Sequence, residues 1–482
     1  MNVDGNGHDS AGLAGPVAIL GGLLLLVCAP IPRGSDYFAA LIPLEFISLA
    51  LLLALIGRVL LNPELVGSAG RIQPLVIALV AAPLLIAVVQ LVPIPASWWD
   101  QLPGHAKYGD ALLAIDAPKV AARPISIAPD VTRASLLAGL PLVAALVLGL
   151  LSTLRQVRVL LRAVVIVAFA EVVLGLLQAS GGEHSPFYFG MLTYGSPIGS
   201  FGTRNEFANM LAMALGVYVW LAFDAIRYKL RLQPGSPMNY GRFSHRHAIA
   251  AWVAGGLVLV VGILMSRSRA GASIGLAAGL LAFAAAGLRV FGWSRGWRFA
   301  LPIAVLLIVT SVTMVGVDVV TSRVTGAQLN TAAGFRTELW QTSFQAALDF
   351  LPFGSGWGTY DIAYGAYQPP AIVGYANHAH MDYVEMLLEG GVLFVALGAC
   401  FAWLAARRTV TLVRRALVQR KLEREAMLAA LCGIALSGFL LHAAVDFPMR
   451  VPANAILACF LAGVFLRPLA LDKGETPSPM QE

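Results

Sequence analysis

Apolar residues run along this chain in blocks of about 18–22, the length of a helix that spans a hydrocarbon core of about 30 Å. Short polar segments rich in Pro, Gly, Arg and Asp separate the blocks. In lipid, a helix satisfies its backbone hydrogen bonds internally. The pattern therefore predicts twelve membrane-spanning helices, at about residues 14–31, 38–57, 73–94, 134–151, 159–179, 205–226, 248–265, 270–289, 300–317, 383–405, 426–445 and 452–466.

The composition supports the same fold class. Of the 482 residues, 58% are hydrophobic and only 12% are charged, whereas soluble domains carry about 25% charged residues. Because so few charges cannot cover a water-exposed surface, we predict an all-α polytopic membrane protein. The net charge of +7 does not indicate nucleic-acid binding, since the basic residues are spread over short loops rather than gathered in one patch.

The distribution of Lys and Arg predicts which loops are cytoplasmic. With a cytoplasmic N-terminus, about two-thirds of the 33 basic residues fall on the inner side, as the positive-inside rule requires. The longest loops then face the periplasm. The predicted organisation is nine spans within 1–317, including a periplasmic segment near 96–133, a large periplasmic catalytic loop at 318–382, three spans within 383–466 and a cytoplasmic tail at 467–482.

Two short segments place arginines on the outer face, where the positive-inside rule does not explain them. Gly199–Ala208 leads through Gly, Ser and Thr into Arg204 at a predicted helix start, and free N–H groups beside a guanidinium suit a phosphate. The turn Ser266–Ala272 carries Arg267 and Arg269 in a loop too short to reach far into water. Both segments predict an anionic partner. The alternatives are that Arg204 snorkels to lipid headgroups, and that the topology of the second segment is inverted.

An apparent amphipathic helix begins near Arg336 in the large outer loop. Its apolar stripe is predicted to comprise Trp340, Phe344 and Leu348. A Gly-rich turn, Pro352–Tyr360, follows it. The spaced glycines resemble a phosphate-binding loop only superficially, because no Gly-Lys-Ser/Thr follows and no strand precedes them, so a nucleotide site is not expected.

The loop ends with two histidines and an aspartate, directly before the tenth predicted span. These are His378, His380 and Asp382. Histidine is the usual general base near neutral pH, so the cluster predicts acid–base chemistry. Two alternatives stay open: the three side chains could bind a metal, although no third strong ligand motif accompanies them, or the histidines could be structural caps.

Four further ionisable residues fall inside or at the end of predicted spans. They are Glu45, Glu171 and the pair His442 and Asp446, one helical turn apart. In a transporter such residues could carry protons. A structural pair, or a wall of a substrate cavity, is an equally good interpretation.

Together these segments resemble the O-antigen ligase and Wzy-type polymerase superfamily of bacterial envelope glycosyltransferases. Twelve spans, cytoplasmic termini and a large outer loop between spans nine and ten fit that family, and the expected architecture is GT-C-like. Its short sequence elements resemble, in order, Gly202–Ala208, Ser268–Ala270, Arg336–Trp340, Pro352–Gly358 and His378–Tyr383. The chain departs from the family pattern at two positions. Met381 stands where the family has a polar residue after the histidine, and Phe394 stands where the family has a small residue or Tyr.

The resemblance implies an inverting transfer of a glycan from undecaprenyl diphosphate to an acceptor hydroxyl, at the periplasmic face of the bacterial inner membrane. A diphosphate is already a good leaving group, so the reaction needs cations to hold it rather than ATP or a nucleotide sugar. Arg204 and Arg269 are the predicted diphosphate ligands, and Arg267 and Arg336 are predicted to support them.

The same resemblance assigns the proton transfer. His380 is the predicted general base and His378 the second choice, with Asn205, Asp382 and Tyr383 in support. The expected partners are the undecaprenyl-diphosphate-linked glycan, lipid A-core or a growing polysaccharide as acceptor, and membrane lipids. No cofactor, metal or nucleic acid is expected.

Several functions remain open at this point. Ligation of O-antigen to lipid A-core is the first choice, polymerisation of an exported polysaccharide is close behind, and glycosylation of protein is a third acceptor choice. A secondary transporter is the alternative from another class. Against a transporter, the loop 58–71 lacks the signature of the major-facilitator fold, and the large external loop breaks the symmetry of its two halves.

Overall fold

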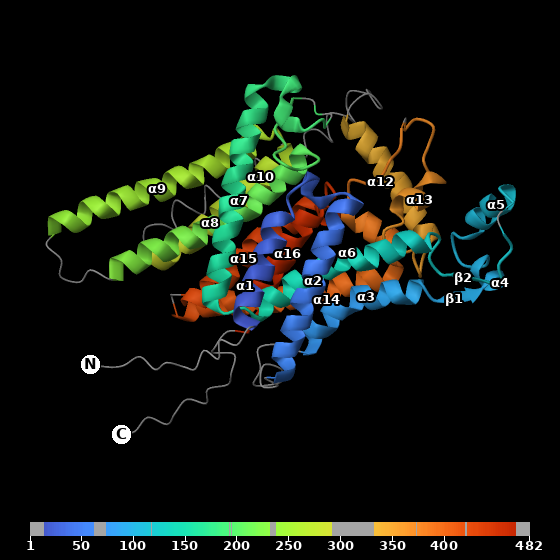
Figure 1. The fold of residues 1–482 in the computed structure, drawn as a ribbon, viewed down its shortest axis with the longest axis horizontal. Coiled ribbons are helices and arrows are strands. Elements are labelled where there is room, and N and C mark those ends of the chain that lie inside the picture. The colour runs from blue at the N-terminus through green and yellow to red at the C-terminus, as the bar shows by residue number, and fades with distance from the viewer. Residues whose placement is uncertain are drawn as a thin grey trace.

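The computed structural model describes residues 14–61, 74–116, 118–191, 193, 195–231, 238–291, 332–372, 374–419 and 422–468 (Figure 1). The ninth predicted span (300–317), the start of the predicted outer loop (318–331) and most of the predicted tail (469–482) lie outside these residues.

The described chain is a bundle of α-helices (Figure 1). Eight helices in it are long and apolar enough to cross a membrane, and three shorter apolar helices accompany them. They coincide with the predicted spans that lie within the described residues, which confirms an all-α polytopic membrane protein. These helices are α1 (Ala14–Cys28), α2 (Phe38–Leu61), α3 (Pro74–Gln90), α6 (Pro129–Leu151), α7 (Leu154–Ser180), α8 (Arg204–Arg231), α9 (Met238–Met265), α10 (Arg269–Phe291), α14 (Asp382–Gln419), α15 (Arg424–His442) and α16 (Pro452–Leu466).

Two helices run well past the ends predicted for them. α9 begins at Met238 rather than near residue 248, and α14 continues to Gln419 rather than ending near residue 405. A hydropathy window ends where charged residues begin, whereas a helix can continue beyond the hydrocarbon as a polar helix. The predicted boundaries were therefore too short at these two places.

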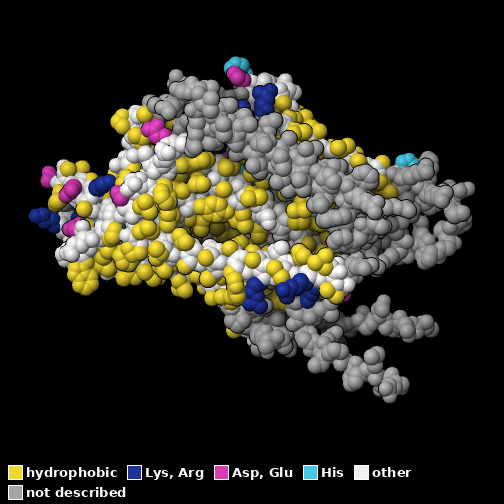
Figure 2. All heavy atoms as spheres, turned by 180° about the vertical axis from the view of Figure 1, so that it is seen from behind, with side chains coloured by type: hydrophobic (Ala, Val, Ile, Leu, Met, Phe, Trp, Pro, Cys, Tyr) yellow, Lys and Arg dark blue, Asp and Glu magenta, His cyan; other side chains and the backbone are white. Residues whose placement is uncertain are grey.

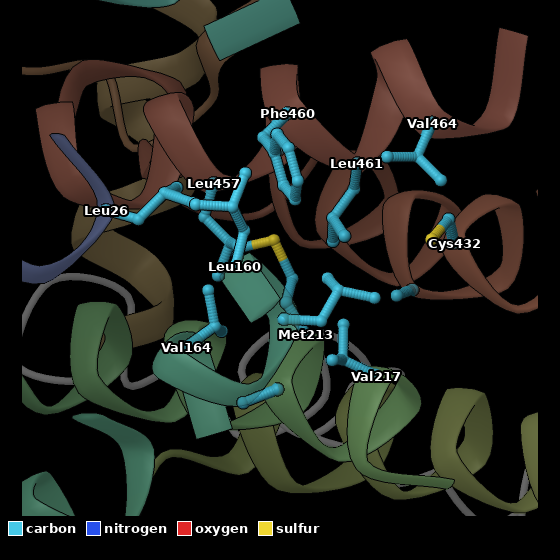
Figure 3. Close-up of a cluster of buried hydrophobic side chains, with 14 of the residues drawn as sticks. Leu26, Leu160, Val164, Met213, Val217, Cys432, Leu457, Phe460, Leu461 and Val464 are labelled. Carbon is cyan, nitrogen blue, oxygen red and sulfur yellow. The ribbon is translucent and has the colours of Figure 1, made fainter. Parts of the chain in front are cut away.

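The centre of the bundle is α8, which contacts α7, α9, α10, α15 and α16. Met213 and Val217 of α8 lie in one buried cluster with Leu160 of α7 and Phe460 of α16 (Figure 3). Gly149 brings α6 directly against α16, because a Cβ at this position would overlap the Phe460 carbonyl oxygen. Small residues at close helix contacts are typical of packing in lipid.

Short elements cover one end of the bundle, at the right of Figure 1. The two long outer loops meet there: Tyr108 Oη donates a 2.5 Å hydrogen bond to the Ala363 carbonyl, and His105 lies between the rings of Trp99 and Phe350. This contact agrees with the prediction that both loops lie on one face. The elements are β1 (Pro93–Pro95), which pairs antiparallel with β2 (Ala122–Pro124), α4 (Ala96–Trp99), α5 (Ala106–Ala114), α12 (Ala332–Asp349) and α13 (Tyr360–Gly365).

The buried face of α12 differs from the predicted stripe. Leu339, Ala346 and Ala347 are buried, whereas Phe344 and Leu348 are 47% and 43% exposed. The prediction of that stripe was wrong: Leu339 and the small residues Ser343, Ala346 and Ala347 form the buried face, and α12 packs on α14.

The Gly-rich turn at Pro352–Tyr360 docks on α14. The N–H of Ser355 donates to the Leu388 carbonyl at 2.8 Å, and the N–H of Gly356 donates to the Glu389 carbonyl at 3.1 Å. Gly354 has φ +78°, and a Cβ at this position would overlap the Glu389 carbonyl. Glycine is needed here for close packing of two backbones.

The surface has the distribution that a bilayer favours. Figure 2 shows a broad hydrophobic area over the middle of one face, with the Lys, Arg, Asp and Glu side chains near its margins. Large apolar side chains such as Phe46, Leu53, Ile166 and Val261 are at least half exposed. Exposure of this kind along apolar helices fits contact with lipid.

Candidate active site

Two side chains of α7 hold the turn that precedes α8. Gln178 Oε1 accepts hydrogen bonds from the N–H groups of Ile198 and Gly199, both at 2.9 Å. Glu171 accepts from the N–H of Ser200 at 2.7 Å and from its hydroxyl at 2.6 Å. Both α7 side chains are buried. Glu171, for which the sequence left several interpretations, thus anchors the approach to α8.

α8 and α10 begin in the same way. The hydroxyl of Thr203 accepts the N–H three residues later at 3.4 Å, and the hydroxyl of Ser268 does the same at 3.1 Å. Each residue is therefore an N-cap, and the residue after it, Arg204 or Arg269, is the first of its helix. Both arginines are exposed, and each is the first residue of its helix, where the helix dipole is positive.

These two helix starts lie side by side. A Cβ at Gly271 would overlap Ala208, so α10 touches α8 within one turn of both arginines. Arg267 is also exposed and has φ +56° in the turn between α9 and α10. Free N–H groups, two helix dipoles and guanidinium groups at one place suit the binding of an anion such as a phosphate.

His380 and Asp446 form the second part of the site. His380 Nδ1 lies 2.9 Å from one carboxylate oxygen of Asp446, and the other oxygen accepts a hydrogen bond from the Asn205 amide. The His380 side chain is 29% exposed and that of Asp446 only 5%. Asn205 is the second residue of α8, so this pair is connected to the helix start that carries Arg204.

The carboxylate determines which nitrogen of His380 is free. An ionised carboxylate only accepts hydrogen bonds, so it stabilises the proton on Nδ1. The opposite nitrogen, Nε2, has no hydrogen-bond partner among the described residues and keeps its lone pair. A partly exposed imidazole in this tautomer can accept a proton from a hydroxyl group.

Two residues of α12 support this pair. The Trp340 indole N–H donates to the His380 carbonyl at 3.1 Å, where His380 has φ +51°. Arg336 Nη1 donates to the Val445 carbonyl at 3.3 Å. Burial favours a raised pKa for Asp446, but the hydrogen bond from His380 and the positive charge of Arg336 outweigh it. The net pKa of Asp446 is therefore lowered.

His378 has different surroundings. Its ring stacks on Phe447 with the centroids 4.2 Å apart, and its Nδ1 lies 3.4 Å from Glu385. Burial alone lowers the pKa of His378, but the hydrogen bond and the charge of Glu385 outweigh it, so the net pKa is raised. The His378 side chain is less exposed than that of His380 (17% against 29%), so it is less accessible to a hydroxyl group.

A buried ion-pair cluster lies beneath the two histidines. Arg450 of the 3-10 turn η5 (Pro448–Arg450) approaches Glu385 at 3.0 Å and Glu389 at 2.7 Å. Glu385 also accepts the N–H of Ala379 at 2.7 Å. Burial opposes the charge of Arg450, but the nearby carboxylates outweigh it and raise its pKa. The cluster connects α14 and η5 to the backbone between the two histidines.

Asp382 and Tyr383, both predicted as supporting residues, bind other groups. Asp382 accepts the N–H of Met449 at 2.8 Å, and Tyr383 Oη donates to the Leu440 carbonyl at 2.8 Å. His378, His380 and Asp382 therefore have three separate partners. Among the described residues, no group of three His, Cys, Asp or Glu side chains is placed to hold a metal ion.

The structure adds residues that the sequence left without a role. Asp446 and His442 were noted only as an intramembrane pair, while Glu385, Glu389 and Arg450 were not singled out. The sequence did contain a signal for them. Glu385 and Glu389 lie four residues apart near the start of a predicted span, and Arg450 lies in a predicted outer turn. A charged side chain at such a place is unfavourable without a partner of opposite charge. Which of them pair could not be read from the sequence.

A family model matches part of the chain. Residues 254–398 match the family model described as O-antigen ligase. No curated protein matches the chain. The matched range contains Arg267, Arg269, Arg336 and both histidines, whereas Arg204 lies outside it.

Proposed function

Because residues 254–398 identify the chain as a member of the O-antigen ligase and Wzy-type superfamily, we propose that it transfers a glycan from undecaprenyl diphosphate to an acceptor hydroxyl. The proposed role is O-antigen ligase with lipid A-core as the acceptor. The family supports an enzyme of the membrane, and we place the reaction at the periplasmic face of the bacterial inner membrane.

The observation that carries this proposal is the pairing of His380 with Asp446 beside the start of α8. His380 Nδ1 is 2.9 Å from Asp446, and Asn205 connects the same carboxylate to the helix that begins with Arg204. A base and a phosphate-binding helix start are thus held together by one carboxylate. Glycan transfer from a lipid diphosphate needs both groups at one place.

In the proposed reaction, the acceptor oxygen attacks the anomeric carbon of the donor sugar. His380 Nε2 takes the hydroxyl proton as the new C–O bond forms. The bond between the anomeric carbon and the diphosphate oxygen breaks, and the electron pair leaves with the diphosphate. Attack from the side opposite the leaving group inverts the anomeric centre.

The arginines stabilise the departing diphosphate. Arg204 and Arg269 lie at the two adjacent helix starts, and we assign them to the diphosphate, with Arg267 and Arg336 in support. Guanidinium groups bind phosphate oxygens in pairs, and helix dipoles add fixed positive charge. The negative charge grows as the bond breaks, so these contacts strengthen in the transition state.

Complementation of a deletion strain tests this function. The strain is complemented with wild type, His380→Ala or His184→Ala, and surface and lipid-linked glycans are separated by gel. His184 is an exposed histidine on the short turn η3 (Gly182–His184) and is the matched control. We expect the deletion to accumulate long lipid-linked chains and to lose the lipid A-bound ladder. Wild type and His184→Ala should restore the ladder, and His380→Ala should not.

The same gel separates the other functions. Accumulation of single lipid-linked repeats in the deletion strain would assign a polymerase. A glycan profile that never changes would contradict a glycosyltransferase and favour a transporter, whose activity would depend on an ion gradient.

A further inference from the structure

His442, at the last residue of α15, has one ring nitrogen without a partner in a polar pocket. The pocket is lined by Thr203, Asn205, Glu206, His442, Asp446, Phe447 and Pro448. The His442 residue is 2% exposed, and its Nε2 has no hydrogen-bond partner among the described residues. A buried polar atom without a partner is costly, by about 1–3 kcal/mol. Such an atom in a pocket indicates a missing ligand group.

The other ring nitrogen of His442 is fixed. His442 Nδ1 lies 2.7 Å from the amide nitrogen of Asn209, a buried residue of α8. The amide N–H donates and Nδ1 accepts, so the proton of the neutral imidazole is on Nε2. The group that points into the pocket is therefore an N–H donor.

The nearest carboxylate is too far away to satisfy that donor. His442 Nε2 and Asp446 Oδ2 are 4.0 Å apart, which exceeds the range of a hydrogen bond. One oxygen atom at about 2.8 Å from each would fit between them, accepting from Nε2 and donating its own proton to the carboxylate. A hydroxyl group or a water has this combination of donor and acceptor, whereas a phosphate oxygen or an ammonium group lacks one of the two.

The ring of Phe447 lies beside this position. Phe447 lines the pocket, and its ring is also the one on which His378 stacks. The pocket combines an apolar side chain with a few convergent polar groups, and its size suits a single hydroxyl group. The chemistry fits a sugar, whose hydroxyl groups project from a ring with apolar C–H faces.

We propose that His442 Nε2 and Asp446 Oδ2 form a hydroxyl-binding site that holds a second hydroxyl of the acceptor sugar, next to the one that reacts at His380. The inference rests on the proposed glycan transfer. His380 is bonded to one oxygen of the Asp446 carboxylate and His442 faces the other, so a hydroxyl bound at Oδ2 fixes the sugar relative to the base. His442 is thus a binding residue that selects acceptors by the position of this hydroxyl.

The kinetic test compares two substitutions at His442. The protein is purified into nanodiscs, and transfer is measured against the concentration of lipid A-core from the deletion strain. His442→Leu removes the donor, whereas His442→Gln keeps an N–H group in a similar place. We expect KM for lipid A-core to rise by about 10- to 100-fold in His442→Leu and by less than about threefold in His442→Gln, with KM for the lipid-linked donor unchanged.

Ser437→Ala is the matched control. Ser437 is on the same helix, is exposed, and donates only to the Gly433 carbonyl of its own turn. Its kinetics should equal those of wild type. An unchanged KM in His442→Leu, or an equal loss of kcat in both His442 variants at constant KM, would overturn the hydroxyl-binding site and leave the glycosyltransferase function intact.

A second measurement does not depend on activity. A high-resolution cryo-EM map of the wild-type protein without substrate should contain density between His442 Nε2 and Asp446 Oδ2, because water occupies the place of the hydroxyl. His442→Leu should lack that density. Its absence from the wild-type map would overturn the inference even if no glycan transfer were detected, whereas a wild-type protein that has the density and transfers nothing would contradict the proposed function instead.

Discussion

Asp446 is the residue on which the candidate site depends most directly. One carboxylate oxygen holds His380 and the other receives the Asn205 amide, so a single buried side chain connects α8, the outer loop and the end of α15. The same arrangement of a carboxylate behind an imidazole orients the base in serine hydrolases. The role of Asp446 here is to position His380 and to fix its tautomer.

Replacement of Asp446 by Asn tests this role. The Asn amide can donate its N–H to His380 Nδ1, which places the imidazole proton on Nε2. In this tautomer Nε2 has no lone pair with which to accept a proton. We expect Asp446→Asn to lower the rate of glycan transfer by a factor on the order of 10²–10⁴ without unfolding the protein. Asp130→Asn, at an exposed position on α6, should have no effect. Near-normal transfer by Asp446→Asn would contradict the assignment.

The arginines at the helix starts can bind a phosphate through two N–H groups at once, which a lysine cannot do. Arg269→Lys keeps the positive charge and loses the two-pronged contact to phosphate oxygens. We expect transfer to fall by about 10- to 100-fold, because one preorganised pair of donors to the diphosphate is lost. The measurement is the initial rate in nanodiscs, with Arg133→Lys, exposed on α6, as the control. A Lys variant with normal activity would argue against a diphosphate contact at Arg269.

Among the elements, α14 and the turn η5 are connected by buried charges. Arg450 meets Glu385 and Glu389, whose side chains are each 1% exposed. Such a cluster need not stabilise the fold more than apolar residues would. Removing one partner is different, since it leaves buried charge without compensation.

We therefore expect Arg450→Leu to lower the stability by about 3–5 kcal/mol. The measurement is the midpoint of thermal or denaturant-induced unfolding in detergent micelles. Arg133→Leu breaks the exposed pair with Asp130 and should change stability by less than about 1 kcal/mol. Equal midpoints for the two variants would mean that the Arg450 cluster contributes no more than a surface pair.

For the whole molecule, the orientation in the membrane determines which side the site faces. The predicted outer loops meet at one end of the bundle, and His380 and the starts of α8 and α10 belong to that part of the chain. We propose that this end faces the periplasm, because the loops predicted on the other side contain about two-thirds of the Lys and Arg residues.

Cysteine labelling tests this orientation. In a variant whose four native cysteines are replaced, Ser97→Cys on α4 should react with a membrane-impermeant maleimide in intact spheroplasts. Val418→Cys, near the far end of α14 and 83% exposed, should react only after lysis. The opposite result would invert the topology and place His380 on the cytoplasmic side.

The sequence alone determined the helices and the chemistry available on the outer face. A span of about 20 apolar residues is recognisable without tertiary contacts, since the bilayer imposes its length on each helix separately. Short motifs likewise identified Arg204, Arg269 and His380 as candidates, because their residue types and positions at helix starts are local features.

Only the tertiary structure decided how these groups pair. His380 meets Asp446 across 66 residues of chain, Arg450 meets Glu389 across 61, and His442 meets Asn209 across 233. It also decided that α12 buries Leu339 and Ala346 rather than Phe344. In lipid, hydrophobicity does not distinguish the protein-facing side of a helix from the other side, so these pairings follow from packing and buried polar contacts between distant segments.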